Sequence, residues 1–282
     1  MKRLILTAML CVAASYGFAQ TTTTTTTTIV DSTKTGTDTT IVTKKHIKVK
    51  LGLGRDVPYV SPYSNDSTKV QRTKAPGFSF GITFSRIDLG FATLVDNGSF
   101  TLSEKNKFLS YRQAKTANFG FDVVQFGYRF NSAFKIYVSG GFDWTNIRLR
   151  QDITIQRNAP VLTFLPDSIH FSKNRFSSSY LRIPLSFYYR SHEDSRGNYF
   201  RLVVGPEVGI LLNGRVKQIS EERGKQKFDD DYHFAKLRKG AFIRMGYGIM
   251  GVYAKYYFND MFENSPAQEG LRNFSFGLTL GF

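Results

Sequence analysis

Four histidines and one acidic run are the side chains most suited to acid–base or metal chemistry. His233 follows the aspartates at 229–231, and an imidazole beside carboxylates can exchange protons or bind a metal ion. The surrounding segment 213–235 holds five basic and five acidic residues, in a spacing that matches no calcium-binding loop. The other histidines are His46, His170 and His192. We therefore interpret 213–235 as a solvated loop of mixed charge.

Nucleophilic chemistry has little support in the sequence. Cys11 is the single cysteine, and no G-x-S-x-G elbow occurs. All four histidines lie outside the segments that alternate as strands. The sequence thus predicts no catalytic residue, no cofactor and no metal site. One enzymatic alternative stays open, in which His170 and His233 serve a lipid-modifying or proteolytic site at the rim of the fold.

A second group of charged residues lies within otherwise apolar segments. If the apolar face of each segment contacts lipid, a charge on that face near the midplane costs about 2–4 kcal/mol, so these side chains must point inward. Inside a narrow barrel they should pair with one another and with tyrosines. We expect a cross-braced lumen rather than a pore. The predicted lumenal charge network is Asp122, Asp143, Arg182, Arg201, Glu207, Arg244 and Lys255.

The elements that position these charges are β-strands. The chain has a net charge of +16, 41% hydrophobic and 15% aromatic residues, and no apolar run of the about 18 residues that a spanning helix needs. Period-two alternation begins at residue 77 and is typical of half-buried strands. The predicted strands are 77–95, 118–130, 134–150, 178–190, 199–212, 236–247, 250–259 and 272–282.

The connections between these strands alternate between long and short. Segments 96–117, 151–177 and 213–235 are long, whereas 131–133 and 191–198 are short. This alternation continues with the very short 248–249 and the longer 260–271. Outer-membrane barrels have tight periplasmic turns and extended outer loops. The pattern predicts an all-β, up-and-down antiparallel transmembrane β-barrel of eight strands, with both ends in the periplasm.

The strand count has one alternative. In 77–95 the apolar phase shifts at Ser85 and Arg86, which a β-bulge within one strand would explain. A hairpin there would instead give nine strands, and the alternating segment 47–53 would make ten. We prefer eight, because the loop lengths then alternate without adjustment.

The last strand carries the most specific pattern. Its apolar face ends the chain on an aromatic residue, and small polar residues occupy the opposite face. Such a strand resembles the C-terminal signal that the outer-membrane barrel assembly machinery recognises, so we expect that machinery as a partner. The residues of this signal are Phe274, Phe276, Leu278, Leu280 and Phe282.

Aromatic residues elsewhere suggest a position at the membrane–water boundary, where ring side chains gather. We expect Tyr253, Tyr256, Tyr257 and Phe258 to lie there as one cluster. Phe142 and Trp144 are further candidates for the boundary.

The N-terminus predicts export. Lys2 and Arg3 precede the apolar segment 4–14 and a small-residue cleavage site between Ala19 and Gln20, so residues 1–19 are expected to be a signal peptide. Residues 20–76 include a threonine octet at 21–28 and are too polar to form a core. We interpret them as a largely disordered periplasmic leader. Its basic charge indicates a solvated tether, because an exported protein has no nucleic-acid partner.

Two internal motifs carry a family resemblance. The segments YLRIPL at 180–185 and VVGPEVG at 203–209, with the closing strand 271–282, resemble the PorT-like outer-membrane β-barrel family of Bacteroidota. The resemblance covers about 77–282. It implies a barrel of eight to ten strands, and one branch of the family is associated with type IX protein secretion. Arg182 stands where the family often carries an acidic residue, so the interior charges of the family cannot be transferred.

These patterns favour a non-enzymatic protein of the bacterial outer membrane. Its domains would be 1–19 as signal peptide, 20–76 as leader and 77–282 as barrel. It would act through its loops and leader as an envelope structural or interaction protein, with outer-membrane lipid and secretion or envelope proteins as partners. A narrow transporter or binder of a small hydrophobic ligand is the first alternative, and the rim-sited enzyme is the second.

Overall fold

The computed structural model describes residues 76–82, 86–194, 197–248 and 250–281. The predicted signal peptide, its cleavage site at Ala19 and Gln20, and the leader up to residue 75 lie outside the described residues. The alternative strand 47–53 and Phe282 also lie outside them. No helix among the described residues is long and apolar enough to cross a membrane.

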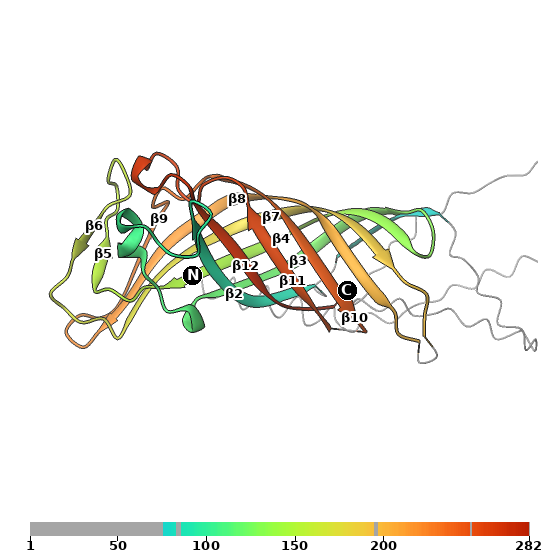
Figure 1. The fold of residues 1–282 in the computed structure, drawn as a ribbon, viewed down its shortest axis with the longest axis horizontal. Helices are drawn as coiled ribbons and strands as arrows, with labels where there is room; N and C mark the ends of the chain where they lie inside the picture. The colour runs from blue at the N-terminus through green and yellow to red at the C-terminus, as the bar shows by residue number, and fades with distance from the viewer. Residues whose placement is uncertain (1–75, 83–85, 195–196, 249, 282) are drawn as a thin grey trace, which may run out of the picture. The chain divides into compact units, whose positions relative to one another are not determined.

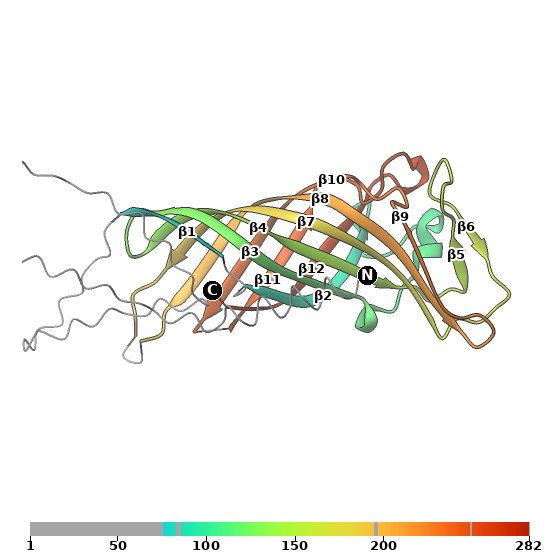
Figure 2. The ribbon, with the colours of Figure 1, turned by 180° about the vertical axis from the view of Figure 1, so that it is seen from behind.

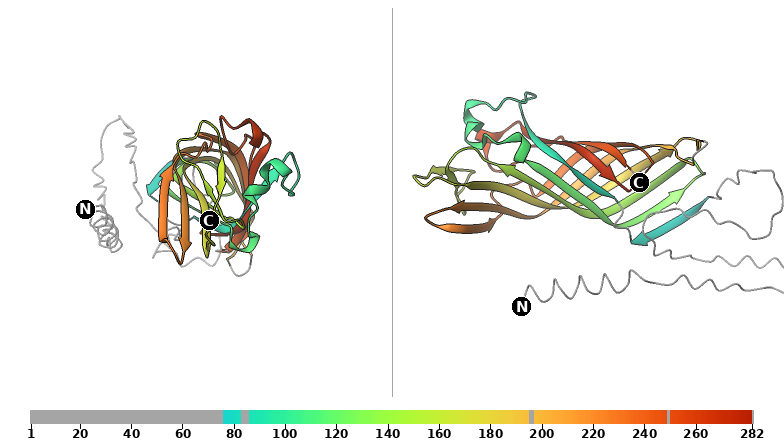
Figure 3. Two further views of the ribbon diagram at one scale, coloured as in Figure 1. Left: turned by 90° about the vertical axis from the view of Figure 1, so that its left-hand side faces the viewer. Right: turned by 90° about the horizontal axis from the view of Figure 1, so that it is seen from below.

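Eight antiparallel strands form a closed ring in the order β3-β2-β12-β11-β10-β8-β7-β4, and pairing of β3 with β4 closes it (Figure 1). The end-on view in Figure 3 shows the strands surrounding one axis. The predicted eight-stranded up-and-down barrel is confirmed. The ring strands are β2 (Ile87–Asp96), β3 (Ala117–Arg129), β4 (Phe134–Arg148), β7 (Lys173–Arg190), β8 (Phe200–Ser220), β10 (Leu237–Tyr247), β11 (Met250–Tyr257) and β12 (Leu271–Leu280).

A short strand, β1 (Gly77–Ile82), precedes the ring. It pairs with residues 124–129 of β3, whereas β2 pairs with residues 117–121 of the same strand. The two strands therefore lie end to end along one edge of β3, and a hairpin between them is excluded. The backbone oxygen of Arg86 accepts a hydrogen bond from the Asp122 amide at this junction, where the β3–β4 register shifts.

The short connections between ring strands lie at one end of the barrel. These are 130–133, 191–199 and 248–249, and the longer connections 97–116, 149–172, 221–236 and 258–270 between ring strands lie at the other end (Figures 1 and 2). The long connections carry a small hairpin of β5 (Ile153–Ile155) and β6 (Phe164–Pro166). They also carry the 3₁₀ helices η2 (Glu104–Leu109), η3 (Gln113–Lys115) and η4 (Pro266–Gln268).

The prediction that 213–235 is one solvated loop is wrong. Strand β8 continues to Ser220 and turns back as β9 (Gly224–Asp230), which pairs with it from Gly214 to Ser220. Strand β7 likewise begins at Lys173 rather than at 178. Beyond the lipid-facing band the outer side of these strands contacts water, so its residues are charged. The hydrophobic alternation that marks a strand therefore fades, although the backbone pairing continues.

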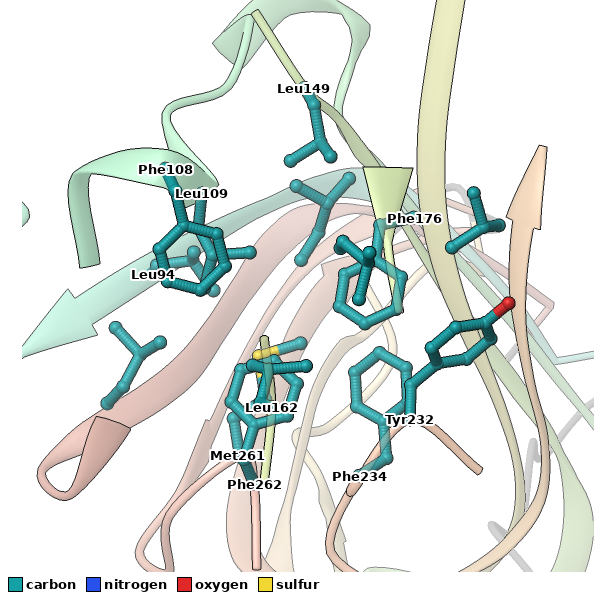
Figure 4. Packing of buried hydrophobic residues seen from close by; sticks show 14 of the residues in the cluster. Leu94, Phe108, Leu109, Leu149, Leu162, Phe176, Tyr232, Phe234, Met261 and Phe262 are labelled. Carbon is teal, nitrogen blue, oxygen red and sulfur yellow. The ribbon is translucent and has the colours of Figure 1, made fainter. Parts of the chain in front are cut away.

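The main apolar core lies among the long connections. Phe176 of β7 stacks on Phe234 with ring centroids 4.6 Å apart, and Phe234 stacks on Phe262 at 5.1 Å (Figure 4). Leucines from β2 and η2 complete the packing. This cluster closes the long-loop end of the lumen with side chains. Its members are Leu94, Phe108, Leu109, Ile147, Leu149, Ile153, Ile155, Leu162, Phe176, Val216, Tyr232, Phe234, Met261, Phe262 and Leu271.

Candidate functional site

Below the apolar cluster, the inward faces of the ring strands carry charged side chains. Alternation within each strand requires this, because the neighbouring residues are the aliphatic and aromatic side chains that face outward. Every member of the set is at most 3% exposed. We call it the lumenal charge network: Asp88, Asp122, Asp143 and Glu207 with Arg182, Arg238, Arg244 and Lys255.

Arg182 lies at the centre of this network. Its Nε donates to Asp122 Oδ1 at 2.9 Å, and its Nη1 donates to Asp88 Oδ2 at 2.6 Å. Arg244 approaches the same Asp88 carboxylate from β10, with its Nε 3.1 Å from Oδ1 and its Nη2 2.8 Å from Oδ2. This paired geometry is among the strongest available to a guanidinium. Contacts of Arg182 and Arg244 thus tie β2, β3, β7 and β10 together.

Lys255 connects the two halves of the network. Its Nζ lies 3.0 Å from Asp143 Oδ1 and 3.2 Å from Asp88 Oδ2. Arg238 Nη2 donates to the other oxygen of Asp143 at 3.0 Å. Asp88 and Asp143, on β2 and β4, are therefore bridged across the lumen by one ammonium group from β11.

Tyrosines extend the network toward the long-loop end. Tyr257 donates its hydroxyl to Glu207 Oε1 at 2.7 Å. The guanidinium of Arg238 lies between two rings, 3.5 Å from the centroid of Tyr180 and 4.1 Å from that of Tyr257. Such stacking stabilises a cation that is removed from water.

Glycine provides the space for these long side chains. A Cβ atom at Gly120 would lie 2.7 Å from Arg182 Nη1 and 3.0 Å from Asp143 Oδ1. Any larger residue there would displace the central guanidinium. The small residue on β3 is thus part of the site, although it carries no functional group.

The network joins four carboxylates to four cations, and each carboxylate accepts a hydrogen bond from a cation or a tyrosine. Arg86, which is also buried, adds a fifth cation through its 3.4 Å contact with Asp122 Oδ2. A buried ion pair gains little net stability over an apolar core, but removal of one partner leaves an uncompensated charge. The arrangement therefore fixes the relative positions of the strands.

The short-turn end of the lumen is also filled. Tyr137, Tyr188, Val203 and Phe242 form a second buried apolar cluster, and the guanidinium of Arg86 lies 4.3 Å from the ring centroid of Tyr137. From one end to the other, the described lumen holds an apolar cluster, a charge network and a second apolar cluster.

The structure brings together most of the side chains that alternation placed inside. Asp122, Asp143, Arg182, Arg244 and Lys255 contact one another through the pairs given above, and Glu207 joins them through Tyr257. Arg201 lies elsewhere. It is at the short-turn end of β8, where its guanidinium is 4.3 Å from the ring centroid of Tyr199 and it donates to the backbone oxygen of Gly248.

Sequence reasoning missed two central members, Asp88 and Arg238. Both carry the same signal as the residues it found. Asp88 lies between the outward Ile87 and Leu89, directly after the phase shift, and Arg238 lies six residues before Arg244 on one face of β10. Asp88 was missed because the phase shift obscured which face of the strand it occupies. Arg238 was missed because the strand was predicted to start at 236, which placed Arg238 near the end of the strand.

Two of the histidines, His170 and His233, make local contacts in the long connections. His170 Nδ1 lies 2.8 Å from Asp152 Oδ2, and His233 Nε2 lies 2.7 Å from the backbone oxygen of Ala159. The acidic run is engaged as well, because Asp229 pairs with Arg215 and the Asn158 amide donates to Asp230 Oδ2. Among the described residues, no group of three or more His, Cys, Asp or Glu is placed to hold a metal ion.

Asp152 organises its connection electrostatically. Burial alone would raise the pKa of this carboxyl group. Hydrogen bonds from the Phe171 amide and from His170 outweigh that effect and hold the pKa below its usual value. The carboxylate is thus charged at neutral pH and orders residues 152 to 171.

The outward faces carry the lipid-facing and aromatic side chains. In β12, Phe274, Phe276, Leu278 and Leu280 face outward and alternate with the buried Asn273, Ser275 and Thr279 and with Gly277. The rings of Phe274 and Phe276 stack at 5.8 Å. The prediction that 253 and 257 lie at the membrane boundary is wrong. Tyr253 and Tyr257 are buried in the lumen, since period-two geometry sends them to the face opposite Tyr256 and Phe258.

The fold and this outward face agree with the comparisons to known proteins. The family described as outer membrane protein beta-barrel domain matches residues 64–263. The chain belongs to this outer membrane β-barrel family. It is accordingly a protein of the bacterial outer membrane, and the ring strands span that membrane.

Two solved structures are similar to the chain at low identity. Both are crystal structures of Ail, the attachment invasion locus protein of Yersinia pestis. The first shares 11% identity at a TM-score of 0.30, over 74% of this chain and 97% of Ail. The second is of Ail in complex with the heparin analogue sucrose octasulfate. It shares 12% sequence identity at a TM-score of 0.30, over 74% of this chain and 100% of Ail. No curated protein matches the sequence.

Proposed function

We propose that this protein is a non-enzymatic interaction protein of the outer membrane, which uses the barrel as an anchor and the long connections as a binding platform. The observation that carries the proposal is the filled lumen. Apolar side chains occupy both ends and paired charges occupy the middle. A barrel filled in this way offers its loops and its termini, rather than its interior, to other molecules.

The long connections support this role because they are joined to one another. The Leu162 amide donates to Ser265 Oγ at 3.0 Å, which links 149–172 to 258–270. His233 contacts Ala159 across the neighbouring connection. Gln218 of β8 donates to the backbone oxygen of Ile153 at 3.1 Å. A preorganised platform of this kind loses less conformational entropy when a partner binds.

We further propose a PorT-like role in protein secretion or envelope assembly. The support for this role is the resemblance of the two motifs, which lie on the paired strands β7 and β8. Arg182 departs from that family's pattern, so the charge network itself is not part of the support. On this proposal residues 1–19 are removed as a signal peptide, and 20–76 form a periplasmic tether that contacts a secretion or envelope partner.

The ends of the barrel fit a periplasmic tether. Gly77 pairs with Arg129 beside the tight turn 130–133, and Leu280 pairs with Met250 beside the turn at 248–249. Both ends of the described barrel therefore lie on the side of the short turns, which is the periplasmic side in outer-membrane barrels.

The test is site-specific photo-crosslinking of the full chain in cells. One crosslinker replaces Leu165, which is 58% exposed on β6, and a second is placed in the leader at Thr35. The matched control replaces Leu278, which is 52% exposed on the lipid-facing side of β12. We expect a discrete protein adduct from Leu165, Thr35 or both, and none from Leu278. Adducts absent from both test positions would overturn the proposal.

A further inference from the structure

A row of basic side chains crosses the outer wall of the barrel at its long-loop end. The strand register places Arg148 opposite Arg175, Arg175 opposite Lys217, and Lys217 opposite Lys227. One row higher, Lys173 and Lys225 both pair with Ile219. The basic belt is Arg148, Lys173, Arg175, Lys217, Lys225 and Lys227.

These six side chains point away from the lumen. Their strand neighbours Phe176 and Val216 are buried in the apolar cluster, so alternation sends Arg175 and Lys217 to the opposite face. Lys173 and Arg175 lie on the same outward face of β7 as Leu181 and Ile183, with Ser177 and Ser179 between the two pairs. The belt is therefore on the same outer wall as the lipid-facing residues.

Among the residues that the structure describes, the six members of the belt form no ion pair with a carboxylate. The acidic residue on this face, Asp229, is bound to Arg215 below the belt, and Glu221 and Glu222 lie in the β8–β9 turn above it. Like charges therefore face one another across neighbouring strands of the belt.

A hollow of about 550 Å³ adjoins the belt, between η3 and the start of β7. Lys115, Arg148, Lys173 and Arg175 line it, together with Ser172 and Asn146. Arg148 already donates to the backbone oxygen of Ser172, which holds its guanidinium at the edge of the hollow. Arg175 Nε is buried without a hydrogen-bond partner in the described structure. The hollow thus presents cationic donors to a group of phosphate size.

The height of the belt relative to the membrane identifies the source of the anion. Along the outer face of β4 the order is Phe142, Trp144, Asn146 and Arg148. Trp144 stacks on Phe119 at 5.5 Å and on Phe142 at 5.7 Å, in an aromatic group of the kind that marks the membrane boundary. Four residues of a tilted strand place Arg148 about 10 Å further out, from which a long side chain reaches the lipid headgroups.

We propose that the basic belt binds phosphate groups on the headgroups of anionic lipids in the outer leaflet. The belt lies on the barrel wall beside the membrane, rather than on top of the loops, so a lipid headgroup meets it by lateral diffusion. Bound lipid would neutralise the row and fix the depth of the β7–β8–β9 extension.

The test compares the full chain with a triple variant, Arg148→Gln, Arg175→Gln and Lys217→Gln, reconstituted in nanodiscs. The discs contain neutral lipid with a small fraction of either a phosphorylated glycolipid or its dephosphorylated form. The matched control variant, Lys105→Gln, Lys236→Gln and Lys239→Gln, removes the same charge outside the belt. Heat-modifiable gel migration verifies that each variant folds, and Lys217→Arg tests whether charge alone suffices.

We expect the wild type, the control variant and Lys217→Arg to retain the phosphorylated lipid. The triple variant should bind this lipid about 100-fold more weakly, because each basic residue near an anionic surface contributes about a factor of five to the affinity. Retention should fall with added salt. Equal binding of phosphorylated and dephosphorylated lipid overturns the proposal. So does displacement of the lipid by equimolar inorganic phosphate, or preference for a soluble sulfated oligosaccharide over the lipid.

Discussion

Asp88 is the residue on which most of the lumenal charge network converges. It accepts contacts from Arg182, Arg244 and Lys255, and its side chain is fully buried. Water cannot replace these contacts in the interior, so the three cations depend on this carboxylate. Asp88 lies directly after a shift in the apolar phase of the sequence. The period-two pattern therefore did not predict that this residue faces the lumen.

Replacement of Asp88 by Asn should destabilise the barrel by about 3–5 kcal/mol, because three buried cations lose their shared anion. The measurement is equilibrium unfolding in urea from lipid vesicles. Glu222→Gln in the exposed β8–β9 turn is the control and should shift stability by less than about 0.5 kcal/mol. An unchanged midpoint for Asp88→Asn would refute the central role of the network.

Protonation of Asp152 gives a pH-dependent prediction. Since the folded-state pKa of this carboxyl is depressed, its contribution to the order of 149–172 is present at neutral pH, above its unfolded pKa. The contribution is lost as the pH falls through the folded pKa. The measurement is the protection of the Phe171 amide from hydrogen exchange in the wild type, divided by its protection in the Asp152→Asn variant. This ratio should decline on acidification, and a ratio that stays constant with pH would contradict the prediction.

The histidines also allow a test of the enzymatic alternative. His170→Ala and His233→Ala should leave lipid composition and protein turnover unchanged, because their observed partners are Asp152 and the Ala159 backbone. His233→Ala should instead loosen the connections by about 1 kcal/mol, the usual value of one hydrogen bond. A loss of lipid modification or proteolysis in either variant would revive the rim-sited enzyme.

At the scale of the elements, close approach between strands depends on glycine. A Cβ at Gly277 of β12 would lie 2.3 Å from the backbone oxygen of Leu89 and 2.4 Å from the Gly90 Cα. Both obstacles are backbone atoms, which cannot move aside as a side chain can. The β2–β12 contact that joins the first and last ring strands is therefore sensitive to one methyl group.

Gly277→Ala should thus impair closure of the barrel, and Gly77→Ala, where a Cβ would meet nothing within 4 Å, should not. The measurement is the fraction of refolded protein that shows heat-modifiable gel migration. Equal closed fractions for the two variants would show that the β2–β12 seam tolerates the added atom.

The β8–β9 extension illustrates why a polar strand escapes recognition. Arg215 and Lys217 face outward while Val216 and Gln218 face inward, so one side is charged and the other only partly apolar. Hydrophobic alternation marks a strand where one side meets lipid or core and weakens where both sides carry polar groups. Backbone pairing with β9 continues regardless of that pattern.

For the whole molecule, the filled lumen predicts the absence of conduction. Purified wild-type protein should give no conductance steps in planar bilayers, and neither should a variant that lacks residues 152–167. In that variant the charge network still occupies the lumen below the shortened connection. A porin in the same bilayer provides the positive control. Stable steps from the wild type would instead favour the transporter alternative.

Local patterning in the sequence sufficed for the strand count, the alternating loop lengths and six members of the charge network. Period-two geometry is a property of each strand alone, so a charge flanked by apolar residues has one allowed face in a membrane. The pairing partners do not follow from that rule. Arg182 could face any inward carboxylate until strand register and barrel closure brought Asp88 of β2 and Asp122 of β3 to it.

What the sequence by itself determined is which side of each strand meets hydrocarbon, because lipid excludes charge at every position independently. Only the tertiary structure decided that Arg238 lies between two tyrosines, that polar connections close over an apolar cluster, and that six basic residues from four strands form one belt. These features join residues that belong to different strands and connections. Their proximity depends on strand register and barrel closure, which are properties of the assembled sheet.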